Sequence, residues 1–146
     1  MITDTLPLKG KLDIKLYDEF GMLKEHREVP NLVVTTGLNN IAERLVTGAT
    51  AVMSYMAVGT SSTAPVLGQT TLVAQSATVA LTSTSVAGSA VSYVASFPAG
   101  TGTALLTEAG IFNNSSGGVM LARSLFTAID KGSSDTLTIT WTITLG

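Results

Sequence analysis

Few residues of this sequence are of the types that catalyse reactions. The one histidine, His26, lies near the acids Glu25 and Glu28. A histidine that acts as a general base needs a nucleophile or a water beside it and a partner that orients its ring. Neither can be identified in the sequence around His26. We therefore expect a solvated histidine at the edge of a sheet, and a protein that is not an enzyme.

The acidic residues and the glycines also lack the spacing of a metal or cofactor site. Asp18 and Glu19 are the only adjacent acids, and turns attract acids because their side chains bond the backbone. Calcium loops place acids at alternating positions around a glycine, and phosphate-binding loops place glycines between a strand and a helix. The absence of cysteine excludes disulfides and thiolate metal sites. We expect no catalytic residue, no metal and no cofactor.

Charge and hydropathy exclude further classes of function. The net charge is −2, and the basic residues do not cluster as they would on a nucleic-acid-binding surface. The first ten residues do not have the pattern of a signal peptide, and no apolar run approaches the ~20 residues that a membrane span needs. The sequence therefore predicts neither a nucleic-acid partner nor a membrane.

The charges are distributed very unevenly along the chain. Thirteen of the eighteen formal charges lie within residues 1–44, and residues 45–107 contain none. The uncharged middle alternates Ser, Thr, Gly and Ala with Val and Leu. Two interpretations remain open: a β-sandwich whose outer faces carry hydroxyl groups, or a surface covered by other protein chains, where charge would be costly to bury.

The stretch that best defines the fold is the last one, residues 135–146. Five threonines alternate there with apolar residues, and successive side chains of a strand point to opposite faces. The stretch is therefore predicted to be a strand with a hydroxyl face and an apolar core face. The core face consists of Leu137, Ile139, Trp141, Ile143 and Leu145.

Similar alternation and turn signals predict the other strands. We expect strands at 10–17, 22–29, 51–58, 74–84, 89–97, 104–113 and 118–127, with a turn at 85–88. A four-residue loop at 114–117 would place Glu108 directly opposite Arg123 as a cross-strand ion pair. About eight short strands without crossover helices are typical of an all-β protein, an antiparallel β-sandwich or jelly roll.

One short α-helix is expected at about residues 37–47. Its apolar stripe consists of Leu38, Ile41, Ala42, Leu45 and Val46, with Thr36 as the candidate N-cap and Gly48 just after the end. Such a stripe usually packs into the core, so we expect the helix to plug one end of the sandwich. Residues 9–146 are expected to form a single domain, preceded by an N-terminal arm at 1–8.

Three aromatic residues could line a sugar-binding site. Tyr93 and Trp141 fall on the apolar faces of predicted strands, whereas a platform for a sugar must be exposed. We therefore expect Tyr55, Tyr93 and Trp141 to belong to the core.

Several segments, in this order, are similar to a group of small structural proteins of tailed bacteriophages. The segments are Asn31-Leu-Val-Val-Thr-Thr-Gly-Leu-Asn-Asn-Ile-Ala, Met53-Ser-Tyr-Met-Ala-Val-Gly-Thr60, Leu106-Thr-Glu-Ala-Gly-Ile-Phe112, Met120-Leu-Ala-Arg-Ser-Leu-Phe126 and the strand from Asp135. The size and the charged N-terminal hairpin most resemble a capsid cement, or decoration, protein. Similar segments also occur in phage tail and fibre proteins.

The resemblance implies a jelly-roll virion protein, made in the host cytoplasm, that binds the capsid exterior as an oligomer. Its partners would be the major capsid protein, whose subunits it bridges, and copies of itself in a homodimer or homotrimer. We expect the arm and the charged hairpin to supply the contacts, namely Ile2, Leu6, Pro7, Lys9, Lys11, Lys15, Lys24 and Arg27. The alternative is a tail-fibre module that binds a receptor or a carbohydrate.

Overall fold

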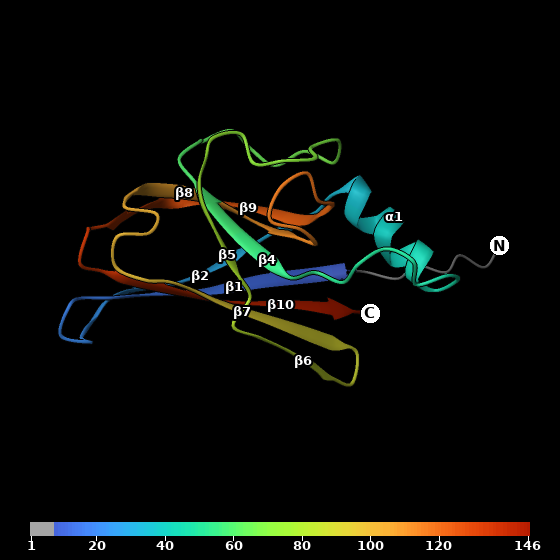
Figure 1. Cartoon of the computed structure of the whole chain (residues 1–146), viewed down its shortest axis with the longest axis horizontal. Helices are drawn as coiled ribbons and strands as arrows, with labels where there is room; N and C mark the ends of the chain where they lie inside the picture. The colour runs from blue at the N-terminus through green and yellow to red at the C-terminus, as the bar shows by residue number, and fades with distance from the viewer. Residues whose placement is uncertain (1–7) are drawn as a thin grey trace.

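Two antiparallel five-stranded sheets make up most of the computed structural model, which describes residues 8–146 (Figure 1). Sheet A has the order β2 (Leu23–Pro30), β1 (Leu8–Tyr17), β10 (Thr136–Leu145), β7 (Ala90–Phe97), β6 (Ser83–Ala87). Sheet B has the order β3 (Leu32–Val33), β9 (Met120–Lys131), β8 (Ala104–Phe112), β4 (Tyr55–Gly59), β5 (Gln75–Ala80). The predicted all-β sandwich is confirmed. The pairs β1–β2, β4–β5, β6–β7 and β8–β9 are hairpins within single sheets.

The structure divides one predicted strand into two. Residues 74–84 were predicted as one strand, but β5 ends at Ala80 in sheet B and β6 begins at Ser83 in sheet A. Leu81 and Thr82 connect sheet B to sheet A, although neither of them is a typical turn residue. The turn predicted at 85–88 also lies elsewhere, because β6 continues to Ala87. The residue with left-handed backbone conformation is Gly88, with φ of 59°.

Strand β10 lies at the centre of sheet A, between β1 and β7 (Figure 1). Four residues of its apolar face, Leu137, Ile139, Trp141 and Ile143, are buried in the main core as predicted, and Trp141 is fully buried. Leu145, the fifth residue of that face, is only half-buried. Trp141 lies opposite Leu12 of β1 and Tyr93 of β7. The five threonines of β10 are half-buried on the outer face. The alternation in the sequence thus predicts the central strand and its orientation correctly.

Helix α1 (Thr35–Arg44) is shifted towards the N-terminus relative to the prediction. Its N-cap is Val34 and not Thr36, and the Thr36 hydroxyl instead donates to the backbone oxygen of Met120 at 2.9 Å. Gly37 lies so close to β9 that a Cβ there would collide with the backbone oxygen of Leu121. The absence of a side chain at Gly37 therefore allows the helix to approach sheet B.

A second, smaller apolar cluster lies on the outer side of sheet B. Leu72, from the long loop between β4 and β5, packs there together with Ala57, Phe112 and Met120. Glycine at 110 provides the space, because a Cβ there would lie 2.9 Å from a Leu72 methyl group. Residues 60–74 therefore cover part of the outer face of sheet B.

Candidate functional site

The most distinctive surface of the described chain is an apolar end of the sandwich, beside α1. Leu45 is 84% exposed, Val46 is 85% exposed and Val52 is 59% exposed. The first two belong to the stripe predicted to be core, and that prediction is wrong. The helix ends at Arg44, so Leu45 and Val46 lie beyond it in the turn that follows.

The packing of α1 explains which of its side chains are buried. Gly37 and Asn40 are the buried residues of the helix, whereas Leu38 and Ala42 are exposed and Ile41 is half-buried. The contact through Gly37 thus rotates the predicted stripe away from the core. A basic residue in a last helical turn is a known C-terminal signal, and Arg44 could have indicated that the helix ends there.

A groove of about 310 Å³ opens at this end, between α1 and both sheets. Most of its lining is apolar: Ile41, Leu45, Val52, Met53, Val91, Tyr93, Leu121, Ile143 and Leu145, together with Asn40 and Arg44. Burial raises the pKa of the Tyr93 hydroxyl, so this group is neutral near pH 7. The groove therefore suits an apolar segment of a partner protein better than a charged small molecule.

Asn40 adds a polar feature to the apolar groove. The residue is 7% exposed, and its Nδ2 atom is buried without a hydrogen-bond partner among the described residues. Buried amide groups are nearly always hydrogen-bonded, because an unpaired donor loses its water without compensation. This amide nitrogen is covered by the protein itself, so it is an unsatisfied group beneath the groove and offers no surface to a bound segment.

The first described strand, β1, begins at the same end of the sandwich. Leu8 starts β1 and lies opposite Leu145, which lines the groove. Figure 1 shows α1 and the C-terminus at this end of the sandwich. Three of the predicted contact residues, Ile2, Leu6 and Pro7, lie outside the described residues.

The basic residues predicted to contact a capsid do not form one patch. Lys9, Lys11 and Lys15 alternate with the core residues of β1 and so share the outer face of sheet A. Arg27 instead donates to the backbone oxygen of Thr127 at 3.1 Å and pairs with Glu25. Lys24 donates to Asp135 at 2.8 Å, and this contact raises the pKa of Lys24 and lowers that of Asp135.

One group of side chains in residues 8–146 has the composition of a metal site. Ligand atoms of Asp13, His26 and Glu28 lie within 4.8 Å of one another on β1 and β2. His26 contacts Asp13, and Lys11 lies 3.6 Å from Glu28. The three side chains therefore form an exposed ion-pair network together with Lys11. This agrees with the prediction of a solvated histidine at the edge of a sheet.

A buried ion pair anchors the loop that covers sheet B. Arg123 donates to Glu108 from Nε at 3.2 Å and from Nη2 at 3.0 Å, and both side chains are fully buried. The loop contributes backbone N–H groups of Ser61, Val73 and Ala74, at 2.8 to 3.0 Å from the Glu108 carboxylate. Burial by itself raises the pKa of Glu108, but these donors and Arg123 together bring it below its usual value. The network is thus a clasp for the loop.

The two residues pair as expected, but the predicted register is wrong. Glu108 lies opposite Leu125, and Arg123 lies opposite Gly110. Phe112 lies opposite Met120, one residue from the predicted register, and the irregularity between Ile111 and Phe112 adds a second residue, so the register at Glu108 differs by two. Because side chains alternate with a period of two, this shift keeps both side chains on one face as diagonal neighbours.

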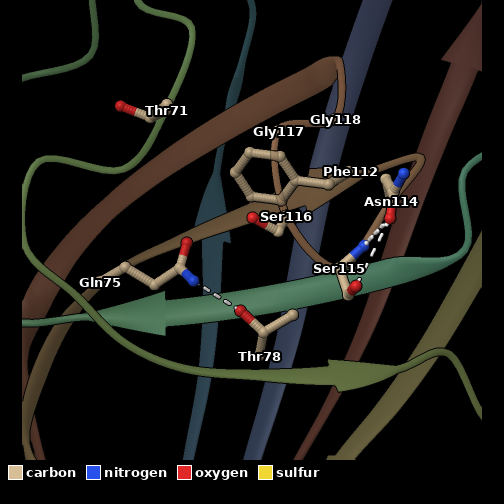
Figure 2. A pocket seen from close by; sticks show the side chains of 9 residues that line it. All are labelled: Thr71, Gln75, Thr78, Phe112, Asn114, Ser115, Ser116, Gly117 and Gly118. Atoms are coloured by element: carbon tan, nitrogen blue, oxygen red, sulfur yellow. Dashed lines mark hydrogen bonds between the residues drawn. The ribbon is translucent and has the colours of Figure 1, made fainter.

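A small polar pocket lies at the tip of the β8–β9 hairpin. Figure 2 shows its lining, which consists of Thr71, Gln75, Thr78, Phe112 and residues 114–118. The volume of the pocket is about 210 Å³. The lining is uncharged, and Gln75 donates to Thr78 at 2.6 Å. Phe112 is mostly buried and contributes to the outer cluster. The pocket therefore offers hydroxyl and amide groups to a neutral polar ligand, with little exposed aromatic surface.

No known protein family, curated protein or solved structure matches this chain. Within residues 8–146, no helix has both the length and the hydropathy needed to cross a membrane.

Proposed function

We propose that this protein is a structural component of a phage virion. It binds the outer surface of the capsid as an oligomer and stabilises the shell by bridging subunits of the major capsid protein. The observation that carries the proposal is the exposed apolar end formed by Leu45, Val46, Val52 and the adjacent groove. Exposed apolar surface of this kind is typical of protein interaction sites, and the resemblance of the sequence to capsid cement proteins supplies the partner.

Other features support a role in assembly. The buried Glu108–Arg123 clasp fixes the loop that covers sheet B, and the lysines of β1 lie on the outer face of sheet A. Each contact with the shell can be weak, because a protein held at several points of a repeating surface gains from effective concentration.

Sedimentation with undecorated phage heads tests the proposal. The wild-type protein is expected to co-sediment with heads, and its binding is expected to saturate as the protein concentration rises. Leu45→Asp is expected to weaken this binding about tenfold or more, because docking would bury a charge in an apolar contact. The control is Phe20→Asp, since Phe20 is 81% exposed and lies in the turn at the far end of β1.

Two results would contradict the proposal. One is the absence of binding to heads, with binding to host cells instead. The other is an equal loss of head binding in the Leu45 and Phe20 variants, because the apolar end would then have no special role.

The uncharged pocket at the β8–β9 hairpin tip favours a second candidate function. A tail-fibre module that binds a host carbohydrate would use the amide and hydroxyl groups of Gln75, Thr78 and Asn114. If this alternative holds, the protein binds host cells and Gln75→Ala weakens that binding. Capsid binding through the apolar end should be unaffected by Gln75→Ala.

A further inference from the structure

One edge of sheet A is formed by β6, an exposed strand without charged residues. Strand β6 pairs with β7 on one side only, and its other side is an edge of the sheet (Figure 1). All five of its residues, Ser83 to Ala87, are exposed, and Val86 is 73% exposed. Its unpaired backbone groups could therefore accept another strand.

The other three edge strands carry features that discourage such pairing. Strand β2 has a run of charged and ionisable residues from Lys24 to Glu28 and ends at Pro30, and β3 has two residues. Strand β5 has a register irregularity where it meets Gly59. Charges, proline, bulges and short length all protect sheet edges. Among the described edges, β6 alone combines a length of five residues with no charge, no proline and an unbroken register with its neighbour, since β3 shares the last three features but has only two residues.

The hairpin geometry shows which backbone groups of β6 are free. A two-residue turn, Gly88-Ser89, joins β6 to β7, and Ala87 and Ala90 flank it as a pair. The pair that flanks a two-residue turn exchanges both hydrogen bonds, and bonded and non-bonded pairs alternate along the ladder. The N–H and C=O groups of Thr84 and Val86 therefore point away from β7.

We propose that β6 pairs antiparallel with β6 of a second copy of this protein, about a two-fold axis at Ser85. Thr84 of each copy then exchanges hydrogen bonds with Val86 of the other, and the two Ser85 residues face each other. An identical copy suits this edge, because a two-fold axis places identical residues close together and a charged strand would repel itself. The two A sheets become one continuous sheet of ten strands, twice the five of each copy.

This inference deepens the proposed function, because it names the surface through which the oligomer forms. The contact is short, so the isolated dimer is weak and gains from effective concentration on a repeating surface. Its test needs only purified protein. A failure of this pairing and a failure to bind capsids can therefore be distinguished.

A single introduced cysteine tests the pairing, because the chain has no cysteine of its own. In the proposed register the Ser85 residues form a non-hydrogen-bonded pair, whose Cα atoms lie ~4.5 Å apart, a separation that a disulfide can span. Ser85→Cys is expected to give a covalent dimer under mild oxidation. The matched controls are Ser83→Cys and Ala87→Cys, at positions that are also exposed but lie two residues from the axis. Each control cysteine should therefore be about 13 Å from its counterpart.

A second variant tests the pairing through charge. Val86→Lys places two ammonium groups near the axis, and as an exposed position it should leave the melting temperature unchanged. Added to Ser85→Cys, it is expected to reduce the dimer yield at least severalfold. The proposal is overturned if Ser85→Cys forms no more dimer than the two cysteine controls. It is equally overturned if Val86→Lys leaves the dimer yield of a normally folded protein unchanged.

Discussion

The carboxylate of Glu108 is satisfied entirely within the protein, by Arg123 and by three backbone N–H groups of the covering loop. Glu108→Gln removes the negative charge and leaves the buried guanidinium uncompensated. We expect the free energy of unfolding to fall by about 3–5 kcal/mol, measured by urea denaturation. Glu28→Gln is the control, because Glu28 belongs to an exposed ion-pair network in which it pairs with Lys11, and its loss should cost about 1 kcal/mol or less. Equal losses would show that the clasp does not stabilise the fold.

The lowered pKa of Glu108 also predicts how stability depends on pH. A carboxyl group whose folded pKa lies below its unfolded value, about 4.3 for Glu, stabilises the fold fully above that value. This contribution is lost as the pH falls through the folded pKa, so it declines below about pH 4. Asp135, whose pKa is also lowered, acts in the same direction.

Comparison with Glu108→Gln isolates the contribution of Glu108 to the acid response. The wild-type protein should lose stability more steeply than the variant between pH 5 and 2, when both are followed by urea denaturation at each pH. Asp135 titrates in both proteins and cancels in the comparison. Parallel curves would contradict a role for Glu108 in acid unfolding.

At the scale of elements, the close approach of α1 to β9 depends on Gly37. Alanine favours a helix by about 1 kcal/mol over glycine, but a Cβ at this position would meet the backbone oxygen of Leu121. We expect Gly37→Ala to destabilise the protein by about 1–3 kcal/mol, measured by thermal unfolding. Gly68→Ala is the control, because no atom lies within 4 Å of its added Cβ. A stabilised Gly37 variant would mean that the helix can move away without cost.

The contrast between β10 and α1 shows which elements could be predicted from the sequence. Alternation of threonine with apolar residues predicts β10, its buried face and the central position of Trp141. The break between β5 and β6 could not be predicted, because Leu81 and Thr82 continue the same neutral alternation. The burial of α1 could not be predicted either, since the contact of Gly37 with β9 overrides the apolar stripe.

The buried clasp shows the same limit within a site. Pairing of Glu108 with Arg123 follows from two strands joined by a turn, and the structure contains that pair. The donors Ser61, Val73 and Ala74 belong to a loop whose path depends on tertiary packing, so no local pattern indicates them. The exposed apolar end was missed for a related reason, because Leu45 and Val46 continue a helical period beyond the actual end of the helix.

At the scale of the whole molecule, the two flanks of the sandwich differ in charge. Strand β2 carries the ionisable run from Lys24 to Glu28 on one flank, whereas β5 and β6 on the other flank contain no charged residue. The apolar groove lies at the end where α1 packs and where β1 begins. A molecule with these features can use one flank for a copy of itself and one end for a different partner. The two surfaces adjoin, because Val91 and Tyr93 of the groove lie opposite Val86 and Thr84 of β6.

Removal of residues 1–7 tests whether the segment that precedes β1 contributes to capsid binding. The first described strand begins at Leu8, so this deletion retains every pair of β1 with β10 and should leave the melting temperature unchanged. Binding to undecorated heads is expected to weaken severalfold in co-sedimentation, because contacts of Ile2 and Leu6 with the shell would be lost. Deletion of residues 1–10 is the contrasting variant. It also removes the pairing of Leu8, Lys9 and Gly10 with β10 and should lower the melting temperature as well. If the shorter deletion binds heads as well as the full chain does, the contacts lie elsewhere on the protein.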